Sequence, residues 1–121
     1  MTLRSLFIVA TLIAAPPALA HETKGPNGGR VVDAGEYHVE LVVAAGQVEV
    51  FLTDGSDQPV AAAGFKGTAI LVADGKAQRI ALEPGQSNQL TGKSSVALPA
   101  DAKGAMQFTA PGGKSAQGQF K

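Results

Sequence analysis

The segment TAILVADGKAQRIAL, residues 68–82, decides the fold class because it encodes a β-hairpin. Two runs rich in Val, Ile, Leu and Ala flank the dipeptide Asp74-Gly75. Asp-Gly suits the positive φ angles of the tight turns that connect antiparallel strands. We therefore predict strands over 68–73 and 76–82, joined by a type I′ turn.

The same pattern continues on both sides of this hairpin. Gly and Pro recur at short intervals, and the runs between them are short and rich in strand-forming residues. No run shows a sustained helical period with caps. This is typical of an all-β sandwich or barrel. We predict an immunoglobulin-like antiparallel sandwich of about seven to nine short strands, with a small β-barrel as the alternative. The other expected strands cover 30–33, 37–44, 47–53, 89–91, 94–98, 104–109 and 114–120.

The first twenty residues have the features of a cleavable secretory signal peptide. Arg4 is their only charge, an apolar run covers 6–15, and two prolines precede the triplet Ala-Leu-Ala at 18–20. That order is the signature of a signal peptide. A membrane anchor is the rival interpretation, but a spanning helix needs roughly 20 apolar residues, and this run is shorter. We expect export by the general secretory route, cleavage after residue 20, and a periplasmic chain that does not span the membrane.

The chain after residue 20 has the size of one compact domain. We divide it into an N-terminal arm over 21–29 and a single β domain over 30–121. Of the ten Lys and Arg residues, all but Arg4 lie in this part, beside ten Asp and Glu, so no basic surface for nucleic acid is expected. The absence of Cys excludes disulfides and thiolate chemistry.

The two histidines of the chain, His21 and His38, are the candidate metal ligands. Cleavage after residue 20 makes His21 the first residue of the mature chain. A free amine and the imidazole of one residue can close a chelate ring on a metal ion, and the amine is readily deprotonated. Nitrogen ligands in a tetragonal array favour Cu(II). We predict a site for Cu(II), or another divalent transition metal, that His38 completes.

Two carboxylates are candidates to support this site. Strand alternation places Glu36, His38 and Glu40 on one face of their strand. Glu36 and Glu40 could ligate the ion or hold the imidazole in one tautomer. The turn sequence GPNGG, residues 25–29, could fold the arm back towards that strand. The alternative is an ordinary solvent-facing strand, with His21 in a disordered terminus.

No catalytic arrangement is recognisable in the sequence. It holds no Gly-x-Ser-x-Gly elbow, no Cys and no His-Glu-x-x-His pair. Asp54, Asp57 and Asp74 have the spacing of turn formers and not that of an EF-hand loop. We therefore expect a protein that is not an enzyme and that buffers or carries its ion. The alternative is a non-catalytic interaction module of the cell envelope that binds no metal.

Four runs carry a resemblance to known proteins: GPNGGRVVDAGEYHVELVV (25–43), VEVFLTDGSDQPV (48–60), GFKGTAILVADGK (64–76) and LEPGQSNQLTG (82–92). They resemble small uncharacterised periplasmic proteins of proteobacteria, and a segment near the N-terminus of the periplasmic adaptors of heavy-metal efflux pumps. The resemblance implies a β domain that handles or senses metal ions, with an envelope efflux component as partner and a role in heavy-metal resistance. Asn27 stands where a further His is familiar in relatives.

Overall fold

The computed structural model describes residues 22–121, so the expected signal peptide and His21 lie outside the described part of the chain. Nine strands and no helix form within it. Accordingly, residues 22–121 contain no helix of the length and hydropathy needed to cross a membrane. The strands are β1 (Thr23–Lys24), β2 (Arg30–Ala34), β3 (Tyr37–Ala44), β4 (Gln47–Thr53), β5 (Lys66–Ala73), β6 (Lys76–Pro84), β7 (Gln89–Lys93), β8 (Gly104–Thr109) and β9 (Ser115–Phe120).

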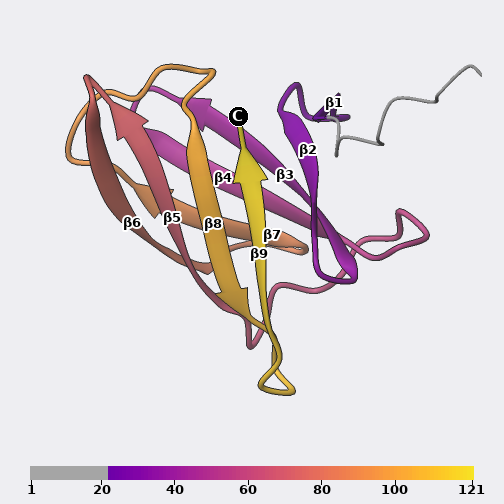
Figure 1. Cartoon of the computed structure of the whole chain (residues 1–121). Coiled ribbons are helices and arrows are strands. Elements are labelled where there is room, and N and C mark those ends of the chain that lie inside the picture. The colour runs from indigo at the N-terminus through magenta and orange to yellow at the C-terminus, as the bar shows by residue number, and fades with distance from the viewer. Residues whose placement is uncertain (1–21) are drawn as a thin grey trace, which may run out of the picture.

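The strands form one antiparallel sheet in the order β1-β2-β3-β4-β7-β6-β5-β8-β9 (Figure 1). The sheet curls into a half-barrel, so that the part around β3 and β4 lies behind the part around β5 and β8 in Figure 1. Strand β6 joins these parts: it pairs with β5 along its length but with β7 only through Glu83 and Pro84. The core lies inside the curl.

The prediction of an all-β fold is confirmed, but the strands do not form the two separate sheets of an immunoglobulin-like sandwich. They make one curled sheet, which is closer to the barrel alternative. Its two ends approach each other where β9 packs against β2. A Cβ added to Gly118 of β9 would lie 3.0 Å from Val32 Cγ2 of β2. Since no ladder pairs these two strands within the described residues, the barrel stays open at this seam.

Most of the expected strands form, and two hairpins follow the turn signals. Asp74 and Gly75 adopt φ angles of 51° and 76°, and Ala45 and Gly46 adopt 49° and 80°, as two-residue hairpin turns require. The strand expected over 94–98 is wrong. There the Ser94 hydroxyl accepts the backbone N–H of Val96 at 3.2 Å, which replaces a strand partner. The two-residue strand β1 was not expected.

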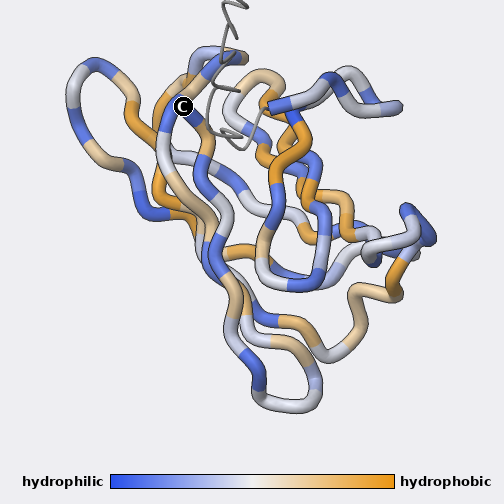
Figure 2. The backbone as a smooth tube through the Cα atoms, turned by 45° about the vertical axis from the view of Figure 1, so that its right-hand side comes forward, coloured by the Kyte–Doolittle hydropathy of each residue, from blue (hydrophilic) through white to orange (hydrophobic). Residues whose placement is uncertain are grey.

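Alternation along the strands builds the core. Figure 2 shows hydrophobic and hydrophilic positions following one another along the strands. Val48, Val50 and Leu52 of β4 are fully buried, whereas their neighbours in the strand are partly exposed. The core consists mainly of aliphatic residues, with a few aromatic rings among them. The rings of Tyr37, Phe65 and Phe108 lie 5.5–5.7 Å apart, centroid to centroid, with the tilted or edge-on geometry that aromatic pairs favour.

The assignment of faces predicts how two adjacent residues of β5 respond to truncation. Leu71 is fully buried and Val72 is 41% exposed. Leu71→Ala should therefore lower the free energy of unfolding by about 2–5 kcal/mol, because it leaves a cavity. Val72→Ala should change it by less than about 1 kcal/mol. Urea denaturation of both variants measures the difference. The opposite ranking would mean that β5 presents its other face to the core.

Candidate functional site

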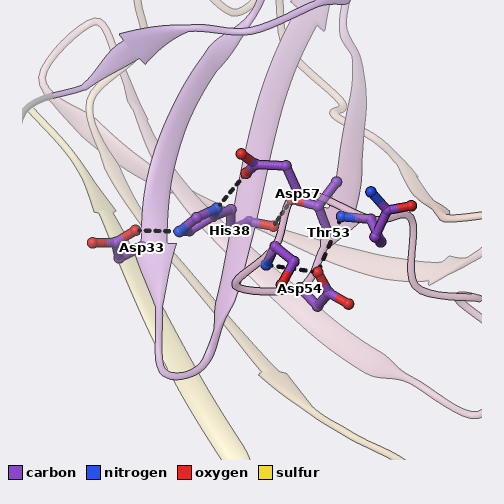
Figure 3. Close-up of polar contacts among 7 residues, drawn as sticks. Asp33, His38, Thr53, Asp54 and Asp57 are labelled. Carbon is purple, nitrogen blue, oxygen red and sulfur yellow. Dashed lines mark hydrogen bonds and ion pairs between the residues drawn. The ribbon is translucent and has the colours of Figure 1, made fainter.

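His38 lies near the start of β3, between β2 and β4, on the face of the sheet that points away from the core (Figure 3). The turn at Gly35 and Glu36 joins β2 to β3, and Gly35 adopts a φ of 60°. Because the turn has two residues, Ala34 pairs with Tyr37 and the next pair is Asp33 with His38. The local hairpin therefore places a carboxylate beside the imidazole.

Two aspartates contact the imidazole from opposite sides, as Figure 3 shows. Nε2 lies 3.1 Å from Oδ1 of Asp33, and Nδ1 lies 2.8 Å from Oδ1 of Asp57. The imidazole is 31% exposed and the two carboxylates are 71% and 82% exposed. A neutral imidazole carries one N–H and can donate to only one of them. Of the two contacts, the one between Nδ1 and Asp57 has the geometry of a hydrogen bond.

Asp57 reaches the imidazole from a loop that its own hydrogen bonds hold together. Oδ1 of Asp54 accepts the backbone N–H groups of Ser56 at 2.8 Å and Gln58 at 3.0 Å. The N–H of Asp57 donates to the backbone oxygen of Asp54 at 3.0 Å. Asp57 itself has a φ of 60°, a conformation that Asp and Asn tolerate better than most residues. The aspartates that the sequence marks as turn formers do form a turn, and one of them also joins the site.

Glu40 shares the outer face of β3 with His38, as alternation predicts, but it does not face solvent. It is only 4% exposed. Oε2 accepts the backbone N–H groups of Asn27 at 2.9 Å and Gly29 at 2.8 Å, and Oε1 accepts the Asn27 side-chain amide at 2.9 Å. Its oxygens are thus used by the turn over 25–29. The carboxylate anchors this turn on β3, and the arm folds back onto that strand.

Glu36 lies in the exposed turn before β3, because the strand begins only at Tyr37. The structure therefore does not bring Glu36, His38 and Glu40 together as a row of side chains. His21 is outside the described residues. Within residues 22–121 no three His, Asp or Glu side chains form a group that could hold a metal ion. The described part of the chain offers an imidazole with two carboxylates on opposite ring nitrogens.

The sequence reasoning missed Asp33 as a neighbour of His38 and gave Asp57 only a turn role. Asp33 could have been found by counting outward from the turn at Gly35 and Glu36, since the register of a two-residue hairpin follows directly. Asp57 carried no such signal. Its position depends on how the loop between β4 and β5 folds, and no periodicity predicts that.

A groove of about 490 Å³ crosses the outer face beside this site. The arm forms one wall and the loop that carries Asp57 forms the other. Strands β2, β3 and β4 supply the floor. The lining residues are Thr23, Lys24, Gly25, Pro26, Asn27, Val31, Glu40, Phe51, Thr53, Asp57, Pro59 and Asn88. The N-terminal arm and the loop of the imidazole site therefore share one concave surface.

Comparisons with protein-family models, with curated proteins and with solved structures find no match to this chain. Nothing in them bears on the resemblance to efflux adaptors.

The loop that presents Asp57 should depend on Asp54. We expect Asp54→Ala to lower the free energy of unfolding by about 1 kcal/mol, because two backbone N–H groups lose their acceptor. Amide hydrogen exchange should accelerate at Ser56 and Gln58. The exposed Asp101→Ala serves as the control in both measurements. Unchanged exchange at the two amides would show that the loop is held by other contacts.

Proposed function

We propose that the mature protein binds a divalent transition metal, with Cu(II) as the preferred ion, and buffers or carries it in the periplasm. The proposal rests on the two contacts of the His38 imidazole. Asp57 holds its Nδ1, while its Nε2 faces Asp33 on the strand next to the N-terminal arm. Metal-bound imidazoles commonly donate their second N–H to a carboxylate, which fixes the ring and its tautomer. Asp57 has the position for that role, which leaves Nε2 as the ligand atom.

Strand β1 of the N-terminal arm pairs with β2, the strand that carries Asp33. Thr23 pairs with Val31 and Lys24 with Arg30, antiparallel. Val31 lies two residues from Asp33, which itself pairs with His38. Adjacent strands are about 4.8 Å apart, so two strand spacings of roughly 10 Å separate the backbones of β1 and β3.

The arm also contributes to the outer face. Thr23 lines the outer groove together with Glu40. That is the face on which His38 and Asp33 lie.

The proposed donor set is the amine and imidazole of His21, Nε2 of His38 and the carboxylate of Asp33. Three nitrogens and one oxygen suit the tetragonal preference of Cu(II), which also binds most tightly in the divalent series. The sequence suggested Glu36 and Glu40 as the supporting carboxylates. The proposal instead assigns Asp33 as a ligand and Asp57 as the group that orients the imidazole. The link to heavy-metal efflux, with an envelope component as partner, rests on the resemblance of residues 25–92 and belongs to the same proposal.

Extending the N-terminus tests the amine. Cu(II) is titrated into the mature protein and into a form with one additional residue before His21, with the d-d absorption and the paramagnetic resonance spectrum as signals. The extended form should bind Cu(II) at least about tenfold more weakly, which corresponds to a loss of ~1.4 kcal/mol in binding free energy, and its spectrum should change. His38→Ala should weaken binding in both forms. Equally weak binding by both forms, unaffected by His38→Ala, would reject the metal site in favour of the interaction module.

Asp57 offers a matched test of the orienting role. Asp57→Asn is compared with Asp74→Asn, because both aspartates are exposed and both adopt positive φ, at 60° and 51°. Asn tolerates this conformation, so neither substitution should disturb its turn. Loss of an orienting carboxylate typically weakens metal affinity about 10–100-fold. We expect that loss for Asp57→Asn and none for Asp74→Asn in the same Cu(II) titration. Equal affinities would remove Asp57 from the site.

A further inference from the structure

Strand β9 is the last strand of the sheet, and it pairs with β8 alone (Figure 1). In their hairpin, the N–H of Ala110 donates to the backbone oxygen of Lys114 at 2.8 Å. Hydrogen-bonded and non-hydrogen-bonded positions alternate in an antiparallel pair. By the register of the hairpin, the even-numbered residues of β9 therefore bond to β8. The backbone N–H and C=O groups of the other three residues point to the free edge. These exposed residues are Ser115, Gln117 and Gln119.

The pairing of β8 with β5 agrees with this assignment. The N–H of Val72 in β5 donates to the backbone oxygen of Lys103, just before β8, at 2.8 Å. By the same alternation, the odd-numbered residues of β8 bond to β5 and the even-numbered ones to β9. Among residues 22–121, no other strand or loop supplies backbone partners to the edge of β9 between Ser115 and Gln119.

The sequence of β9 leaves this edge able to accept another strand. Natural proteins protect edge strands with charged residues, Pro or bulges within the strand. The sequence SAQGQF, residues 115–120, has no charge and no Pro, and its register with β8 runs without a bulge. The nearest charges in the sequence are Lys114 and Lys121, one directly before the strand and one directly after it.

The outer face beside this edge is hollowed and positively charged. Two shallow hollows, of about 580 and 530 Å³, share Gln107 and Gln117 in their linings. The charged residues that line them are Lys66, Lys103 and Lys121, and no Asp or Glu of residues 22–121 lines either hollow. This face therefore attracts carboxylates.

The charges of the chain divide in the same way. Residues 22–60, which include β1 to β4, carry seven Asp and Glu but two Lys and Arg. Residues 61–121, which include β5 to β9, carry three Asp and Glu but seven Lys and Arg. The free edge of β9 thus belongs to the positive part of the molecule.

We propose that β9 pairs with an extended acidic segment of another protein, which adds a strand to the sheet. Such a segment supplies main-chain donors and acceptors at the spacing of the edge. Every second side chain of the segment lies on the outer face beside the hollows. Carboxylates at those positions are attracted by the lysines at both ends of β9. Neither His38 nor a metal ion takes part.

The other face of the added strand calls for apolar side chains. On the inner side of β9, a Cβ added to Gly118 would lie 3.0 Å from Cγ2 of Val32 and 3.4 Å from Cβ of Ala34. Both of these residues of β2 are buried and apolar. The segment that fits this edge therefore alternates acidic and apolar residues.

Two other occupants fit the edge less well. Antiparallel pairing of β9 with a second copy of itself would bring Lys114 of one copy close to Lys121 of the other at both ends, and like charges that face each other across strands are destabilising. A polyanion without peptide groups would meet the lysines but leave the edge N–H groups without partners.

The first test adds a peptide of about eight residues, alternating Glu and Val and blocked at both ends, to the ¹⁵N-labelled mature protein. Amide exchange should slow at Gln117 and Gln119. It should stay unchanged at Ala116 and Gly118, because their N–H groups already bond to β8. A peptide that alternates Lys and Val should protect none of these amides.

Substitutions separate the charges from the edge itself. Lys114→Glu combined with Lys121→Glu should weaken binding of the acidic peptide about tenfold. Lys76→Glu combined with Lys93→Glu changes the net charge equally, at exposed residues outside both hollows, and should keep the affinity. Gln117→Pro removes an edge N–H that β8 does not use, and should abolish the protection.

Three outcomes would overturn the proposal. The first is the absence of protection at Gln117 and Gln119 when the acidic peptide is added. The second is equal weakening by the two double variants together with equally tight binding of inorganic polyphosphate, which would indicate a general anion-binding surface. The third is protection of the same amides without peptide that increases with protein concentration, which would make a second copy the occupant.

Discussion

The register of the β2–β3 hairpin is the constraint on which the outer face depends. The two-residue turn at Gly35 and Glu36 aligns Asp33 with His38 and, two positions further, Val31 with Glu40. A shift of one residue in this pairing would turn every side chain of one strand to the other face, which would send Val39 to solvent and His38 to the core. The burial of Val39 and Leu41 in the core opposes such a shift. The packing of the core therefore determines which side chains lie together on the outer face.

The outer face then uses its carboxylates in two different ways. Glu40 is buried and fully occupied by N–H donors of the arm, so its charge holds backbone in place. Asp33 and Asp57 are exposed and both approach one imidazole. An exposed carboxylate loses little hydration when it exchanges partners, whereas a buried one would lose its hydrogen bonds. This difference is why the metal proposal assigns Asp33, and not Glu40, as a ligand.

Much of the fold could be predicted from the sequence, because turn chemistry and alternation are local signals. The bounds of β3 and β4 were expected as they are, and the Asp74-Gly75 hairpin formed with the φ angles that its residues favour. The path of the sheet was not predictable in this way. Whether strands close into one curled sheet or two facing sheets depends on a junction of two residue pairs between β6 and β7. The prediction of a strand over 94–98 was wrong because alternation does not show that the Ser94 hydroxyl accepts a local hydrogen bond there.

The candidate site was also only partly predictable from the sequence. The position of Asp33 beside His38 follows from hairpin geometry. The position of Asp57 and the anchoring of the arm on Glu40 require the folded loop and turn.

Pulsed paramagnetic resonance of Cu(II) bound to the mature protein, with histidine labelled by ¹⁵N, counts the ligating imidazoles directly. Two labelled imidazoles are expected in the parent protein and one in His38→Ala. A single imidazole in both, or none, would contradict a site built from His21 and His38.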